Sequence, residues 1–146
     1  MTLPELEDQI TVMMAGQAAE ESIYDGVMST GAGDDLHRAS ELIRQMVMRF
    51  GMSKRLGHLT YGAPQNAQYL RFPFVSAERN YSDKTSEAID AEVRRISDEL
   101  YLRAMTILIR RRAQLERIAV ELIQKETLDR RQIDLLLPFP LKEITA

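Results

Sequence analysis

Apolar residues recur at intervals of three and four positions along most of this 146-residue chain. The clearest repeat comprises Ala39, Leu42, Ile43, Met46, Val47 and Phe50. Residues at these intervals share one face of an α-helix, so the pattern predicts an amphipathic helix that ends before Gly51.

Other segments show the same helical spacing and lie at residues 3–26, 82–123 and 128–136. The inward face of the first segment is predicted to comprise Leu6, Ile10, Met13, Met14, Ala18 and Ile23. In the longest segment the inward spacing is interrupted at residues 110–112, three consecutive arginines, so a bend is expected there. We therefore expect an all-α fold, a single helical domain of about five helices.

Polar residues mark where the helices begin. Thr2 and Glu5 have the spacing of a capping box, in which each side chain bonds the other residue's backbone N–H. Ser82 and Thr127 are predicted to cap the third and the last helix. Pro138 prevents the last helix from continuing.

A long loop is predicted between the second and third helices. Residues 52–81 lose the helical spacing and contain several glycines, prolines and amides, with a short extended piece at 69–75. The expected organisation is a helical region over residues 1–137 and a carboxy-terminal tail over residues 138–146. The apolar patch at 69–74 has two interpretations, a partner contact or a loop folded over the core.

Composition excludes several classes of function. The chain has no cysteine, which excludes disulfides and cysteine zinc sites. Its 19 basic and 22 acidic residues are interspersed and give a formal charge of -3, which argues against nucleic-acid binding. Without a long apolar run or a signal sequence, the sequence predicts a soluble chain with no membrane segment, typical of the cytoplasm.

The junction before the second helix combines glycines with acids. Gly31 and Gly33 permit backbone angles that other residues resist. We expect Asp34 to cap the helix by accepting hydrogen bonds from its first amides, which places Asp35 at the first helical position. From the residues alone, Asp35 is a first-turn acid stabilised by the helix dipole, and Glu20 is a solvated side chain.

A series of ordered motifs surrounds this junction: Gln17-Ala18-Ala19-Glu20-Glu21, Ser29-Thr30-Gly31-Ala32, Asp34-Asp35-Leu36, Phe50-Gly51-Met52-Ser53, Ile89-Asp90-Ala91-Glu92-Val93 and Lys125-Glu126-Thr127-Leu128. In this order, over roughly residues 3–136, the chain resembles the zinc-metalloprotease domain of the FtsH family of ATP-dependent proteases. The chain departs from the family's usual residues at Gln17, where arginine is usual, and at Asp34, where asparagine is common.

The resemblance implies roles for two acidic residues. Asp35 falls on the family's third zinc ligand, a carboxylate supplied from a different helix than the ligand histidines. Glu20 falls on an acidic position near the metal, where it would orient a ligand histidine. The chain has only two histidines, His37 and His58, and they are too far apart to form the family's His-Glu-x-x-His helix. We expect this motif to lie upstream of Met1, so the chain itself contains no catalytic and no cofactor-binding residue.

The resemblance also implies how the chain would act. In the family, an ATPase module feeds unfolded protein substrates to a zinc peptidase, usually in a membrane-anchored hexamer. This chain lacks the Gly-x-x-x-x-Gly-Lys-Ser/Thr loop that binds nucleotide phosphates. We expect a homo-oligomer that belongs to such a peptidase domain but binds no zinc and cleaves no protein alone. The alternative is a non-catalytic helical scaffold for oligomerisation or partner binding.

Overall fold

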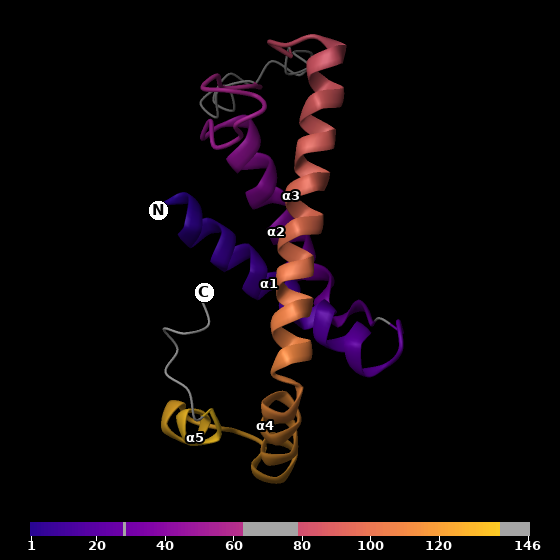
Figure 1. Cartoon of the computed structure of the whole chain (residues 1–146), viewed down its shortest axis with the longest axis vertical. Coiled ribbons are helices and arrows are strands. Elements are labelled where there is room, and N and C mark those ends of the chain that lie inside the picture. Colours follow the sequence, from indigo (N-terminus) through magenta and orange to yellow (C-terminus); the bar gives the residue numbers. More distant parts are fainter. Residues whose placement is uncertain (28, 63–78, 138–146) are drawn as a thin grey trace, which may run out of the picture.

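A computed structural model describes residues 1–27, 29–62 and 79–137 (Figure 1). Its elements are α1 (Leu3–Ile23), the 3-10 turn η1 (Thr30–Ala32), α2 (Gly33–Met48), α3 (Asp83–Arg110), α4 (Arg112–Lys125) and α5 (Arg130–Leu136). The described residues contain five α-helices and no strand, so the predicted all-α fold is confirmed. No helix within these residues is long and apolar enough to span a bilayer.

Side-chain caps set several helix boundaries. Thr2 and Glu5 form the predicted capping box at α1, and Ser82 Oγ accepts a hydrogen bond from Thr85 N at 3.2 Å at the start of α3. The cap predicted for the last helix is wrong by two residues. Asp129 Oδ1, not Thr127, accepts from Gln132 N at 2.8 Å, so α5 begins at Arg130.

The hydrophobic core lies where α1, α2 and α3 pack together, near the middle of the molecule in Figure 1. Its buried residues come from all three helices: Leu6, Ile10, Met14, Ala39, Ile43, Met46, Val47, Ile89, Ile96 and Leu100. Inward residues predicted for α4, among them Leu122 and Ile123, are exposed, and so is one predicted inward residue at the end of each of the first two helices. Ile23 is 37% exposed because α1 ends there, and Phe50 is 50% exposed because α2 ends two residues earlier.

The carboxy-terminal helices form an arm that leaves this core. The predicted bend occurs at Arg111, where α3 ends and α4 begins, and Figure 1 shows α4 and α5 below the end of α3. Neither α4 nor α5 contains a buried residue. We call residues 112–137 the arm.

The described ends of the long loop lie side by side. Gly62 N donates a hydrogen bond to Asn80 Oδ1 at 2.8 Å. The ring centroids of Tyr61 and Tyr81 lie 5.8 Å apart in an edge-to-face arrangement. Residues 52–62 form neither helix nor strand, as predicted. The extended piece expected at 69–75 and the tail at 138–146 fall outside the described residues.

Candidate functional site

The junction between α1 and α2 is held by a clamp between Glu20 and Ser29. Ser29 N donates to Glu20 Oε2 at 2.7 Å, and Ser29 Oγ donates to Glu20 Oε1 at 2.7 Å. The same hydroxyl oxygen accepts from Gly31 N at 3.1 Å, which caps η1. Both carboxylate oxygens of Glu20 therefore hold the turn that leads into α2.

These hydrogen bonds favour the ionised form of Glu20. The backbone N–H of Ser29, followed by its hydroxyl, lowers the pKa of the Glu20 carboxyl below its usual value. The neighbouring Glu21 accepts a hydrogen bond from the Tyr101 hydroxyl on α3. Burial, then this hydrogen bond, raises the pKa of Tyr101 to about 12. The acidic end of α1 is thus attached to both the α2 junction and α3.

The predicted cap of α2 is wrong. The helix begins at Gly33, one residue before Asp34, and its cap residue Ala32 accepts no side-chain hydrogen bond. Gly33 adopts φ of -64°, an ordinary helical angle, so the freedom of glycine is not used there. The 3-10 turn η1 directly precedes α2 and includes Gly31.

Asp34 and Asp35 both lie in the first turn of α2, where the helix dipole favours negative charge. Asp35 is exposed, and its carboxylate forms no hydrogen bond or ion pair with the described part of the chain. The close approach of α1 lies just before it, since a Cβ added at Gly16 would lie 3.9 Å from Ala32 Cβ. The structure brings Glu20 to the turn before Asp35, but no described contact joins the two carboxylates.

The described residues do not form a zinc site by themselves. No group of three His, Cys, Asp or Glu side chains within residues 1–27, 29–62 and 79–137 could hold a metal ion. His37 lies two positions after Asp35 on α2, His58 lies in the loop after α2, and both are exposed. One carboxylate is too few, because a hydrolytic zinc needs about three protein ligands and an open position.

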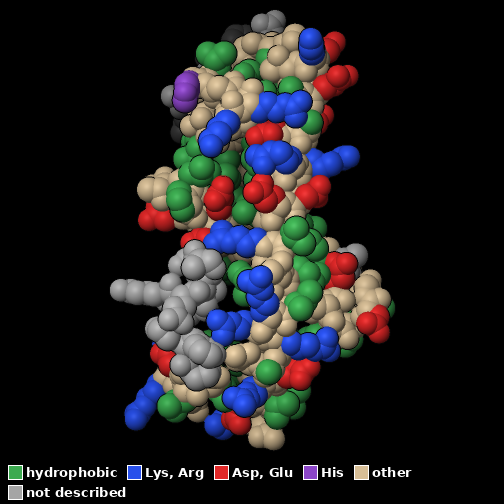
Figure 2. Space-filling model, viewed as in Figure 1, with side chains coloured by type: hydrophobic (Ala, Val, Ile, Leu, Met, Phe, Trp, Pro, Cys, Tyr) green, Lys and Arg blue, Asp and Glu red, His purple; other side chains and the backbone are tan. Residues whose placement is uncertain are grey.

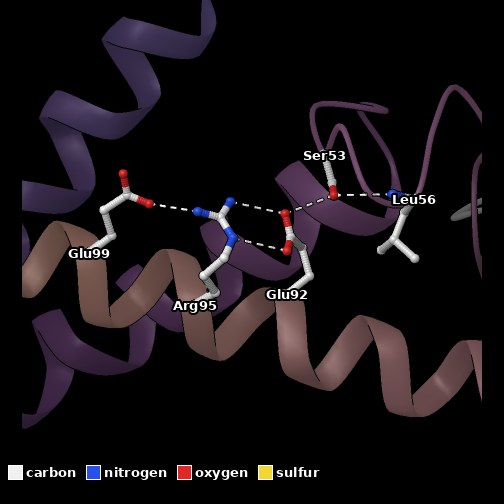
Figure 3. A network of polar contacts seen from close by, with 5 residues as sticks. All are labelled: Ser53, Leu56, Glu92, Arg95 and Glu99. Carbon is white, nitrogen blue, oxygen red and sulfur yellow. Dashed lines mark hydrogen bonds and ion pairs between the residues drawn. The ribbon is translucent and has the colours of Figure 1, made fainter.

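Sequence reasoning missed a buried charge. Glu92 is only 2% exposed, and its carboxylate accepts hydrogen bonds from three donors (Figure 3). Arg95 Nε and Nη2 donate at 3.0 Å each, and Ser53 Oγ donates to Oε1 at 2.9 Å. The signal was present in the spacing, because Glu92 follows Ile89 by three positions and precedes Ile96 by four. A polar residue on that face must find partners when the face is buried.

This cluster joins the loop after α2 to α3. Ser53 Oγ also accepts from Leu56 N at 3.3 Å, and Arg95 Nη1 continues the chain of contacts to Glu99 Oε2 at 2.6 Å (Figure 3). The hydrogen bonds from Arg95 lower the pKa of the Glu92 carboxyl and raise the pKa of the guanidinium. A carboxylate with three donors is satisfied and ionised. This geometry suits a structural link between the loop and α3 rather than a proton-transfer group.

Comparisons with known proteins agree with the ordered motifs. The model of peptidase family M41 matches residues 1–136. ATP-dependent zinc metalloprotease FtsH of Bacillus subtilis is 46% identical over 132 residues, which cover 90% of this chain and 21% of that protein. FtsH 1 of Thermomicrobium roseum is 44% identical over 139 residues, which cover 95% of this chain and 21% of that protein. The chain therefore spans about a fifth of the length of these curated relatives.

Proposed function

Because this chain belongs to peptidase family M41, we propose that it is the helical part of an ATP-dependent zinc metalloendopeptidase that degrades proteins. The observation that carries the proposal is the family match over residues 1–136. In this role the chain supplies Asp35 as the third zinc ligand, and it works within a homo-oligomer, a hexamer as in the family.

The geometry of the junction supports the role of Asp35. Its carboxylate is exposed and has no partner in the described chain, so no existing ion pair must break before it binds a metal. The Glu20–Ser29 clamp fixes the turn just before it, and a fixed backbone reduces the entropy lost on ligation. In this proposal Glu20 orients one of the ligand histidines, a role suited to an ionised acceptor.

Zinc binding in this proposal needs a His-Glu-x-x-His helix from outside residues 1–146. That helix would supply two imidazole ligands and the general base, and the bound zinc would supply a water activated for attack on a peptide bond. The contribution of this chain is to hold one anionic ligand on a rigid helix start. Alone, the chain is proposed to bind no zinc and to have neither peptidase nor ATPase activity.

The test adds a synthetic peptide carrying the family's His-Glu-x-x-His helix to the purified chain and measures bound zinc by competition with a chromophoric chelator. We expect zinc to bind only when both parts are present. Asp35→Ala abolishes this binding, whereas Asp34→Ala, a neighbouring acid in the same helical turn, retains it. Equal binding by the two variants would contradict the ligand assignment. Casein cleavage by the chain alone would contradict the proposed dependence on the histidine helix.

A non-catalytic scaffold is the second candidate, and one observation favours it. The arm exposes large apolar side chains, among them Val120, Leu122, Ile123 and Leu135, which a partner or a second copy could cover. Light scattering on the purified chain tests this function. Stable oligomers that gain no zinc when the histidine peptide is added would support the scaffold and contradict the peptidase role.

A further inference from the structure

An apolar groove lies where α3 gives way to the arm. It is a partly open cavity of about 200 Å³, and its apolar walls are Ile107, Leu108, Leu115, Ile118 and Leu137. Hydrophobic side chains are also visible at the lower end of the molecule in Figure 2, where α4 and α5 lie. Arg111 and Gln114 line the groove as its polar members. A groove of this composition favours apolar side chains over a charged ligand.

The chain itself leads into this groove. Leu137 is both a wall of the groove and the last described residue. Its φ of -107° and ψ of 89° are extended, as expected for a residue before proline, so the backbone has already left the helical direction of α5. Whatever follows Leu137 starts at the wall of the groove.

The segment that follows is chemically suited to fill it. Residues 138–146 read Pro-Phe-Pro-Leu-Lys-Glu-Ile-Thr-Ala, so Phe139 and Leu141 come within four residues of the groove wall. At about 3.3 Å per residue, both side chains can reach the cavity. Two prolines lower the entropy that an extended segment loses on docking, because their φ angles are already fixed. We propose that residues 138–146 dock in this groove, with Phe139 and Leu141 as the apolar anchors.

Tethering favours this occupant over a second copy of the chain. A segment joined directly to its site has an effective concentration in roughly the millimolar range, which free chains in dilute solution do not reach. Docking also covers apolar walls that the arm otherwise leaves open, since α4 and α5 bury no residue. In this proposal the tail packs against the arm and supplies apolar contacts that α4 and α5 lack.

Thiol labelling tests the proposal, because the chain contains no cysteine. Leu115→Cys places a single thiol in the groove, and Ile123→Cys places a matched thiol on the same helix, 81% exposed and outside the groove. Alkylation by iodoacetamide is measured in the full chain, with and without the pair Phe139→Asp and Leu141→Asp. Circular dichroism establishes that each variant is folded.

We expect the two aspartates to speed alkylation at position 115 at least about fivefold, because they release the cover that protects the thiol. Alkylation at position 123 should not change. The proposal would be overturned if the thiol at position 115 were alkylated at the same rate with the wild-type tail and with the Phe139→Asp, Leu141→Asp tail. Protection that disappears on tenfold dilution would also overturn it, since a tethered tail protects independently of concentration and a second copy does not.

Discussion

The two halves of this chain are built from similar helices but differ in what those helices bury. Helices α1, α2 and α3 share a core in which Ile10 and Ile43 are fully inaccessible to solvent, whereas the arm has no buried residue. Both halves have helical apolar spacing in the sequence. The difference shows that an apolar stripe specifies a helix locally, but a core requires a second stripe that faces it.

Truncating a buried side chain in the core should lower stability far more than the same truncation in the arm. Ile10→Ala removes a side chain that is 0% exposed, and we expect it to lower the free energy of unfolding by about 2–5 kcal/mol through the cavity it leaves. Ile123→Ala makes the same change in the arm, where we expect less than about 0.5 kcal/mol. Urea unfolding followed by circular dichroism measures both. Similar losses would contradict the division into a packed core and an exposed arm.

The buried Glu92 should be the next most sensitive position. Glu92→Gln removes a charge from three hydrogen bonds, and we expect a loss of about 1–3 kcal/mol in unfolding free energy. Glu99→Gln is the matched control, because Glu99 bonds the same arginine from an exposed position on the same helix. Its expected cost is below about 0.5 kcal/mol. Equal costs would show that burial does not distinguish the two carboxylates.

The effect of Glu92 should also depend on pH with a defined sign. The pKa of its carboxyl in the folded chain lies below the ordinary value of 4.5, so the ionised form stabilises the fold above that pH. As the pH falls through the lowered pKa, this contribution is lost. The stability difference between wild type and Glu92→Gln should therefore be constant from pH 7 to about pH 5 and shrink below it. A difference that grows in acid would contradict the assignment.

Removing a helix cap should have the smallest effect on the free energy of unfolding, and the effect should differ between the core and the arm. Thr2 and Asp129 both form capping boxes, one in the core and one in the arm. We expect Thr2→Ala to lower the global unfolding free energy by about 1 kcal/mol. Asp129→Ala should instead speed amide hydrogen exchange in α5 and leave global unfolding nearly unchanged. Equal effects on global unfolding would indicate that the arm and the core unfold as one unit.

These contrasts explain which features the sequence could predict. Periodicity located the long helices, and hydroxyl residues located the starts of α1 and α3, because both signals act over a few residues. The burial of Glu92 was missed because its partner Ser53 lies 39 positions away, and only the tertiary fold brings them together. Phe50 has core chemistry at a helical interval, yet it lies beyond the end of α2 and is half exposed.

The candidate site shows the same division between local and distant information. Ordered motifs identified the junction and its acids, but the hydrogen bonds between Glu20 and Ser29 depend on how the chain reverses between α1 and η1. Asp34 was expected to cap α2, and instead the helix begins one residue earlier behind a 3-10 turn. Turn type at a glycine-rich junction depends on the helices that it joins, which a local motif does not specify.

Zinc affinity tests the central claim most directly: the core presents Asp35 as one ligand of a metal site that a histidine helix completes. The chain is joined to the family's His-Glu-x-x-His helix, and the zinc dissociation constant is measured for wild type, Asp35→Ala and Asp34→Ala. We predict that Asp35→Ala weakens binding roughly 100-fold or more and Asp34→Ala less than about threefold, because even outer-shell substitutions cost 10–100-fold. Equal affinities for the three proteins would contradict the claim.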